Sequence, residues 1–217
     1  EFQAARAAIV AAQATAMQGK ARNHVVHYRT NLGEAGSETK IQLNAFYFPE
    51  VDVFGLGFPS SLERAPLAGN RVVLAHEFGH SVFEDTFNAN DGVCAEDHEI
   101  TLDFPGRFRS WPTVGGFNEG FADLMAYGAT GVLDIIGGSI AGGGHDRALD
   151  ARVPGYAAFR FSNRGDVCTA SPYCTGTLFA RAVVQAFLAQ TQATPSEADR
   201  RLLLRDLIDA VALMPAA

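Results

Sequence analysis

The order of segments along the chain predicts an α+β fold, with a β-rich N-terminal lobe and a mainly helical C-terminal lobe. The β-rich segments come first, at residues 23–31, 40–48 and 51–58. Apolar residues recur at helical spacing in the later stretches. One of these, "VVLAHEFGHSV" at residues 72–82, lies where the strands give way to helices. We therefore expect a helix at the seam between two lobes, residues 1–85 and 86–217, that together form one functional unit.

The helical segments are expected from apolar spacing and from start and stop signals. They cover residues 2–17, 70–82 and 118–136, and the apolar repeats at 178–187 and 203–211. Ser196 and Asp199 have the spacing of a capping box before the last repeat. Residues 81–118 are acidic and contain Gly and Pro, so we expect an inserted loop in which Gly115 and Gly116 shape a turn.

The composition excludes several classes of partner. A net charge of −7 without a cluster of Lys or Arg argues against a nucleic-acid partner. No apolar run reaches the roughly 20 residues that span a bilayer, so no membrane-spanning segment is expected. The chain is long enough for a hydrophobic core of its own, and we expect a monomer. Its first residues, "EFQAARAAIV", show no signal peptide, as in a mature or trimmed chain.

Two of the three cysteines lie close together in the sequence. Cys168 and Cys174 occupy the polar segment "CTASPYC", whose spacing allows a small disulfide ring. Such a disulfide favours an oxidising compartment, so a secreted or periplasmic protein is expected. The alternative is a pair of free thiols. Cys94 is interpreted as a lone thiol.

The segment "HEFGH" at residues 76–80 has the residue types and the spacing of a metal site. Residues four apart lie one turn above each other on a helix, so His76 and His80 can direct imidazole nitrogens at one zinc ion. Glu77 lies one position further round the helix and is suited to take a proton from a metal-activated water. The motif also occurs by chance, so its weight depends on a third ligand.

The third ligand is expected from a second helix. Phe83 and Thr86 stand at the Gly and His positions of an H-E-x-x-H-x-x-G-x-x-H site, which excludes that arrangement. The segment "NEGFAD" supplies Glu119 among apolar residues, with Asp123 one turn later. A carboxylate at Asp123 can accept a hydrogen bond from the outer nitrogen of a ligand histidine. The alternative, a solvated Glu119, is disfavoured by the apolar neighbours.

Together the two motifs resemble the gluzincin metallopeptidases, and the wider context looks most like the thermolysin and fungalysin group. The segment "NAFY" at residues 44–47 is similar to the family's edge strand, which lies antiparallel to bound substrate. The segment "VDVFGLG" resembles the next strand of that hairpin. "DRALDARVP" is loosely similar to a segment with a substrate-binding arginine, and "TGTLFARAVVQAFLAQ" to a late helix. The resemblance covers about residues 20 to 190.

The resemblance implies a zinc-dependent endopeptidase with a thermolysin-like, two-lobed fold. The zinc ligands that it implies are His76, His80 and Glu119. Glu77 would activate the attacking water and carry its proton to the leaving amine, while Asp123 would orient a ligand histidine. A peptide or protein substrate would be held as an added strand. The substrate-binding residues that the resemblance implies are Asn44, Ala45 and Arg147.

The chain departs from the family pattern at the calcium-binding and oxyanion-stabilising positions. Val72 and Thr130 stand where acidic calcium ligands would fall, so the paired calcium site is not expected. Any calcium would need the acidic residues of 81–118, for which a solvated loop is the better interpretation. The family's oxyanion histidine has no counterpart. Tyr173 or His145 can replace it as a donor to the tetrahedral intermediate, or each can be a structural loop residue.

Two other functions stay open on the sequence. "NEGFA" also resembles the gluzincin aminopeptidases, although "LNAFYF" does not match their Gly-x-Met-x-Asn strand. A zinc-stabilised binding module with decayed catalytic machinery would account for the missing histidine, whereas the intact Glu77 weighs against it. The pattern gives neither the side-chain preference nor the natural substrate.

Overall fold

The computed structural model of the chain describes residues 7, 11, 27–30, 45–48, 53–56, 67–88, 111–136, 147–151, 172–191 and 194–213. Within these residues the strands come first: β1 (His27–Thr30), β2 (Ala45–Phe48) and β3 (Val53–Leu56). A short 3-10 helix and four longer helices follow: η2 (Leu67–Gly69), α2 (Arg71–Asn88), α3 (Trp111–Thr130), α5 (Pro172–Thr191) and α6 (Glu197–Ala212). None of these helices is long and apolar enough to cross a membrane.

The described strands form one sheet in the order β1-β3-β2. Strand β3 pairs in parallel with β1 and antiparallel with β2, in a register that places Ala45 opposite Leu56. Strand β2 is therefore an edge strand of the described sheet, which agrees with the expectation for "NAFY". The buried Phe54 of β3 faces α2, where its ring centroid lies 6.4 Å from that of Phe78. The sheet is thus joined to the first central helix through aromatic contacts.

Helix α2 begins at a side-chain cap and continues beyond its expected end. The carboxamide oxygen of Asn70 accepts hydrogen bonds from two backbone N–H groups of the first turn, at 2.9 and 3.4 Å. The sequence predicts an end near Val82, but the helix runs to Asn88. It does so because Phe83 and Thr86 continue its buried face. The prediction that a loop starts directly after the metal motif is therefore wrong.

Helix α3 contains two glycines that the sequence predicts in a turn. It begins at Trp111, several residues earlier than expected, so Gly115 and Gly116 are helical and the turn prediction is wrong. A Cβ atom at Gly116 would lie 2.9 Å from a side chain of α5, and one at Gly120 would lie 2.6 Å from the carbonyl oxygen of Gly176. These glycines lower the helix propensity, but they let α3 and α5 approach closely.

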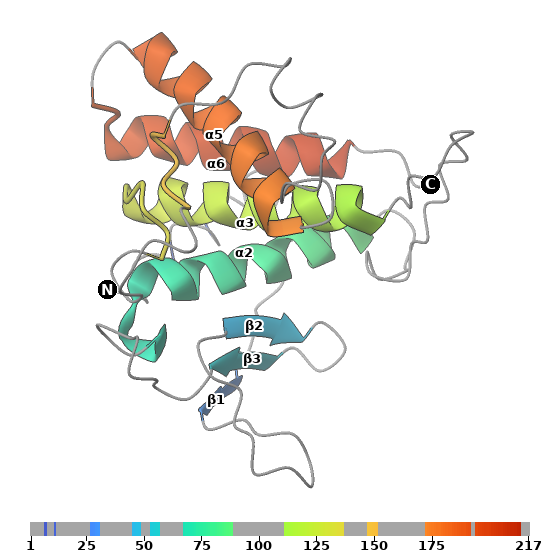
Figure 1. Cartoon of the computed structure of the whole chain (residues 1–217). Coiled ribbons are helices and arrows are strands. Elements are labelled where there is room, and N and C mark those ends of the chain that lie inside the picture. The colour runs from blue at the N-terminus through green and yellow to red at the C-terminus, as the bar shows by residue number, and fades with distance from the viewer. Residues whose placement is uncertain are drawn as a thin grey trace, which may run out of the picture.

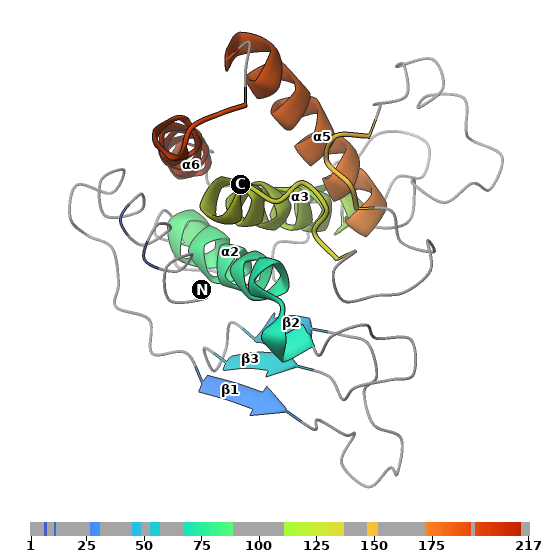
Figure 2. The same ribbon diagram turned by 90° about the vertical axis from the view of Figure 1, so that its left-hand side faces the viewer.

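The helices stack in layers over one face of the sheet (Figure 1). Helix α2 lies between the sheet and α3, and α3 lies between α2 and the pair α5 and α6 (Figure 2). One cluster of buried residues includes Phe54 of β3, Phe78 of α2, Leu124 of α3 and Leu204 of α6. Both expected lobes contribute to this core, and the expected boundary after residue 85 falls inside α2. The two-lobed, thermolysin-like architecture stays a prediction.

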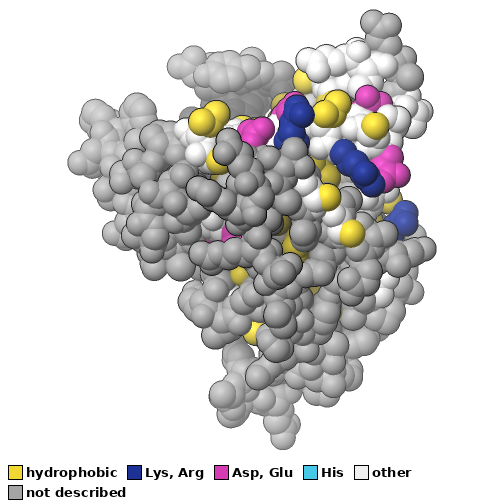
Figure 3. Space-filling model, turned by 180° about the vertical axis from the view of Figure 1, so that it is seen from behind, with side chains coloured by type: hydrophobic (Ala, Val, Ile, Leu, Met, Phe, Trp, Pro, Cys, Tyr) yellow, Lys and Arg dark blue, Asp and Glu magenta, His cyan; other side chains and the backbone are white. Residues whose placement is uncertain are grey.

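Helix α6 has the cap and the apolar face that its sequence predicts. The Ser196 side chain accepts a hydrogen bond from the backbone N–H of Asp199, and the Asp199 side chain accepts one from the backbone N–H of Ser196. The predicted capping box is confirmed. The helix buries Leu204, Ile208 and Val211. On the face seen in Figure 3, acidic and basic side chains of the described residues lie interspersed and do not gather into patches of one sign.

Candidate metal centre

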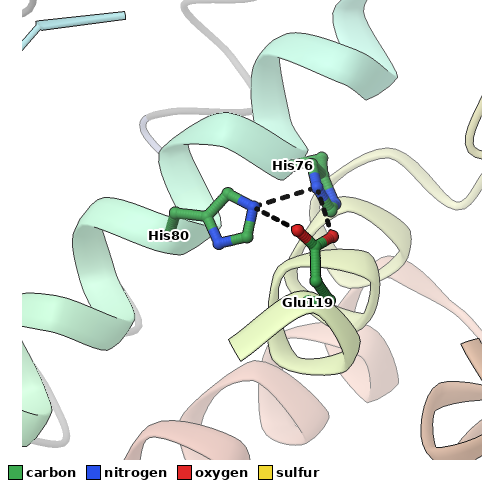
Figure 4. Close-up of side chains that lie close together, drawn as sticks. All are labelled: His76, His80 and Glu119. Carbon is green, nitrogen blue, oxygen red and sulfur yellow. Dashed lines mark hydrogen bonds and ion pairs between the residues drawn. The ribbon is translucent and has the colours of Figure 1, made fainter. Parts of the chain in front are cut away.

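Helix α2 places His76 and His80 on one face, one turn apart. Their Nε2 atoms lie 3.1 Å apart, and their rings meet edge to face with centroids 4.6 Å apart. Both side chains are nearly enclosed, with exposed fractions of 6% and 13%. The two rings therefore turn their nitrogens toward one point inside the protein (Figure 4).

Helix α3 brings Glu119 to the same point, opposite the two rings (Figure 4). Its Oε2 lies 3.4 Å from Nε2 of His76, and its Oε1 lies 3.8 Å from Nε2 of His80. Ligands of a tetrahedral zinc ion, bound at about 2.0–2.1 Å, lie roughly 3.4 Å apart. The observed separations of 3.1, 3.4 and 3.8 Å match this value. The three residues can therefore hold a metal ion, as the sequence predicts.

Asp123 and Arg147 enclose the outer side of His76. Asp123 is fully buried, and its Oδ1 lies 2.9 Å from Nδ1 of His76. This contact favours a proton on Nδ1, which leaves the Nε2 lone pair for a metal. Arg147 donates from Nη2 to Asp123 and, at 3.1 Å, to Oε2 of Glu119. The guanidinium therefore links Glu119, one candidate metal ligand, to Asp123, the partner of His76.

The outer nitrogen of His80 meets two residues to which the sequence pattern assigned no role in the site. Its Nδ1 lies 2.8 Å from Oδ1 of Asn118, and Nδ2 of Asn118 donates to Oε1 of Glu84 at 3.4 Å. The position of Asn118 directly before Glu119 was the available signal. Glu84 was expected in a solvated acidic loop. This expectation is wrong, because α2 continues through Glu84 and buries it.

Glu77 lies buried next to the histidines, with 4% of the residue exposed. Its Oε2 has no hydrogen-bond partner among the described residues. Burial raises the pKa of its carboxyl to about 7, against the opposing effect of His76. A carboxyl group with a pKa near neutrality can both accept and return a proton, which is the property that a general base requires.

Without a metal, the ligands share their protons unequally. Burial and Arg147 lower the pKa of His76, but its contacts with Asp123 and Glu119 outweigh them and raise that pKa to about 9. Burial lowers the pKa of His80 to about 4. Burial raises the pKa of Glu119, yet the histidines and Arg147 outweigh it, so the net pKa is lowered to about 2. At neutral pH the site therefore holds a proton on His76, which a metal must displace.

Tyr173 lies near the start of α5, against the Arg147 guanidinium. The guanidinium carbon is 5.7 Å from the centroid of the tyrosine ring, and 51% of the residue is exposed. Burial of part of the side chain raises the pKa of the phenol, and the negative charge of Glu119 adds to this. The phenol therefore keeps an O–H group for donation at neutral pH.

The remaining predicted site residues are only partly described. Ala45 opens the edge strand β2. Asn44, His145 and Cys168 lie outside the described residues. Cys174 is disulfide-bonded, and its partner also lies outside them, so the pairing with Cys168 stays a prediction.

Val72 and Thr130 stand where the resemblance would place acidic calcium ligands, and both residues have other roles in the structure. Val72 is 6% exposed and belongs to the hydrophobic core. The hydroxyl of Thr130 donates to the carbonyl oxygen of Ala126 at 2.7 Å. A hard cation requires six to eight oxygen ligands, and Val72 offers none. The expectation that the paired calcium site is missing stays a prediction.

Comparison with known proteins yields no relative of the chain: no family model, no curated protein and no solved structure matches it. The geometry of the site and the motifs in the sequence are therefore the basis for its function.

Proposed function

We propose that the chain is a zinc-dependent endopeptidase. The observation that carries this proposal is the convergence of His76, His80 and Glu119 from two helices, with the buried Glu77 next to them. Two imidazoles and one carboxylate are typical of catalytic zinc, because three protein ligands leave one coordination position open. A structural zinc site uses four protein ligands and needs no adjacent base. The resemblance to thermolysin-like gluzincins supports the same function.

In this mechanism Glu77 carries the proton. Zinc, when bound, supplies a Lewis acid that polarises a carbonyl group and makes water acidic near neutral pH. Glu77 accepts a proton from the attacking water and delivers it to the nitrogen of the leaving amine. Its buried Oε2 and its pKa of about 7 suit both transfers. Asp123 and Asn118 contact the outer nitrogens of the two histidines, and these contacts would orient both rings toward a bound metal.

The substrate is proposed to bind as an extended peptide along β2, held by Asn44 and Ala45. The place of β2 at the edge of the described sheet supports this mode, because an edge strand can pair with an added strand. Arg147 is the proposed donor to a substrate carbonyl, and Tyr173 the proposed donor to the oxyanion of the tetrahedral intermediate. The disulfide at Cys174 supports a secreted or periplasmic location.

The test combines metal analysis with two kinds of substrate. The purified chain should bind zinc and hydrolyse casein and an N-blocked internal peptide. A chelator should abolish the hydrolysis and added zinc should restore it. Preference for a free aminoacyl amide over the blocked peptide would identify an aminopeptidase instead. Tight zinc binding without hydrolysis of any substrate would identify a zinc-stabilised binding module, and failure to bind zinc would contradict all three functions.

A further inference from the structure

Glu84 is linked to one of the proposed metal ligands, His80, through the side chain of Asn118. It follows His80 by four residues on α2, so it lies one turn later on the same face. Only 4% of the residue is exposed. A buried carboxylate is costly unless it forms hydrogen bonds, and Glu84 accepts one from Asn118 on α3. Asn118 therefore connects Glu84 to the metal centre.

The two hydrogen bonds of the Asn118 side chain are consistent with only one orientation of its amide group. A carboxylate only accepts, so the amide NH2 group of Asn118 faces Oε1 of Glu84, at 3.4 Å. The amide oxygen then faces His80, 2.8 Å from Nδ1. Because this oxygen also only accepts, Nδ1 carries the proton of the neutral ring. The Nε2 lone pair is then left on the side of Glu119.

His76, the other proposed ligand histidine, does not need a partner that is held in one orientation. The outer partner of His76 is Asp123, a carboxylate that accepts through either oxygen. The partner of His80 is an amide, which has one accepting and one donating end. An amide that turned its NH2 group toward Nδ1 would favour a proton on Nε2, and that tautomer cannot bind a metal through Nε2.

We propose that Glu84 is a positioning residue of the metal centre. By holding the amide of Asn118 in one orientation, Glu84 fixes the tautomer of His80 and directs its Nε2 lone pair toward the metal. This role rests on the proposed function only in that a metal binds at His76, His80 and Glu119. It does not require that the chain hydrolyses peptides.

The test exchanges donor and acceptor between Glu84 and Asn118. In Glu84→Gln the side chain can donate as well as accept, so the Asn118 amide is no longer held, and the zinc affinity should fall about tenfold. Asn118→Asp places two carboxylates together and should also weaken binding. The double variant should recover affinity to within about threefold of the parent. In that variant the new amide donates to the new carboxylate, which still accepts from His80.

Zinc dissociation constants are measured by competition with a chromogenic chelator, so the result does not depend on hydrolysis. Thr86→Val is a matched control, because it removes a buried hydroxyl of α2 that donates to the carbonyl of Val82, at 2.6 Å. Its affinity should equal that of the parent. Parent-like affinity in Glu84→Gln would overturn the role of Glu84. So would a double variant in which the two single losses simply multiply.

If Glu84→Gln fails to fold, the tautomer of His80 in the parent chain tests the proposed action of Glu84 instead. Nitrogen-15 NMR of the metal-free protein should show the proton of His80 on Nδ1. A proton on Nε2 would overturn the proposed action of Glu84. A parent that binds no zinc overturns both the peptidase proposal and this role. A parent that binds zinc but hydrolyses no peptide overturns only the peptidase proposal, and parent-like zinc affinity in Glu84→Gln overturns only the role of Glu84, so the failures are distinguishable.

Discussion

Helices α2 and α6 are similar in length and belong to the same core, yet they bury different kinds of side chain. Helix α6 buries the apolar residues Leu204, Ile208 and Val211. None of its charged residues is fully buried, and Arg201 pairs with Glu197 at the surface. Helix α2 also buries polar and charged residues, namely His76, Glu77, Ser81, Glu84 and Thr86.

This difference separates the residues that stabilise the fold from those that form the candidate metal centre. The hydroxyl groups of Ser81 and Thr86 donate hydrogen bonds to backbone carbonyl groups of α2. Their burial therefore costs little free energy of folding. His76 and Glu84 contact residues of α3 instead. Burial of titratable groups is unfavourable unless they meet partners, and a fold alone does not require it. Helix α2 thus departs from the amphipathic pattern where the candidate metal centre lies.

The largest expected effect comes from Glu119→Ala, which removes the proposed zinc ligand that α3 contributes. Loss of a residue that hydrogen-bonds to a metal ligand costs about 10–100-fold in metal affinity, and loss of a ligand itself should cost more. Zinc content and hydrolysis should therefore fall together. Glu197→Ala on α6 is the control, because it removes an exposed carboxylate from a surface ion pair and should change neither. A Glu119→Ala variant that keeps the parent zinc affinity would exclude Glu119 as a ligand.

Glu77→Gln should separate metal binding from turnover. The amide keeps the size of the side chain but cannot accept a proton from water, and a general base contributes about 10²–10⁴-fold. Turnover of a blocked peptide should fall by that factor while the zinc content stays at the parent level. Steady-state kinetics and metal analysis on the same preparation measure both quantities. Hydrolysis at near the parent rate would show that another group is the base.

Leu204→Ala should give the opposite result, a loss of stability with an intact site. Leu204 is fully buried and packs over Gly128 of α3. Removal of its methyl groups should lower the free energy of unfolding by about 3 kcal/mol. Urea denaturation measures this change, and zinc titration of the folded variant should give the parent affinity. A large loss of zinc affinity would mean that the metal centre depends on α6 packing.

A smaller effect is expected from the pH dependence of stability in the metal-free protein. Folding raises the pKa of Glu77 from 4.5 to about 7 because the carboxyl is buried. The folded state therefore binds more protons than the unfolded state between these values, so this contribution is complete below pH 4.5 and is lost as the pH rises toward 7. Glu77→Gln removes this dependence. Its stability relative to the parent should be higher at pH 8 than at pH 5, by on the order of 2–3 kcal/mol.

Urea denaturation with a chelator present, at both pH values, measures this difference. A gap between Glu77→Gln and the parent that is the same at pH 5 and pH 8 would show that Glu77 titrates normally in the folded protein.

The features that the sequence predicted correctly are those that depend on the local geometry of a helix. His76 and His80 meet because residues four apart share a helical face, and Asp123 lies one turn from Glu119 for the same reason. The capping box of α6 is equally local. In each case the spacing along one helix fixes the relation between side chains, without knowledge of the tertiary structure.

The features that the sequence did not reveal depend on contacts between helices. Gly115 and Gly116 are typical of a turn, and at Gly116 only the close approach of α5 makes a glycine favourable in the helix. Asn118 and Glu84 are separated by most of the segment expected to be a loop, so nothing local links them. The extension of α2 also depends on burial against α3, because Phe83 packs on Phe121, with ring centroids 5.5 Å apart.

The smallest expected effect is at the start of α6, where the sequence predicted the structure best. Ser196→Ala removes the side-chain oxygen that accepts from the Asp199 backbone N–H, and the loss of an N-cap costs about 1 kcal/mol. Ser196→Gly is the matched control, since glycine at this position costs only a few tenths of a kcal/mol.

Hydrogen bonds from Ser196 also lower the pKa of Asp199, so this part of the cap is present above the normal aspartate pKa and is lost as the pH falls through the lowered value. The stability difference between parent and Ser196→Ala should therefore shrink in acid. A difference in urea denaturation that stays constant down to the lowest pH at which the protein is folded would show that the hydrogen bond from the Ser196 hydroxyl to the Asp199 carboxylate contributes nothing.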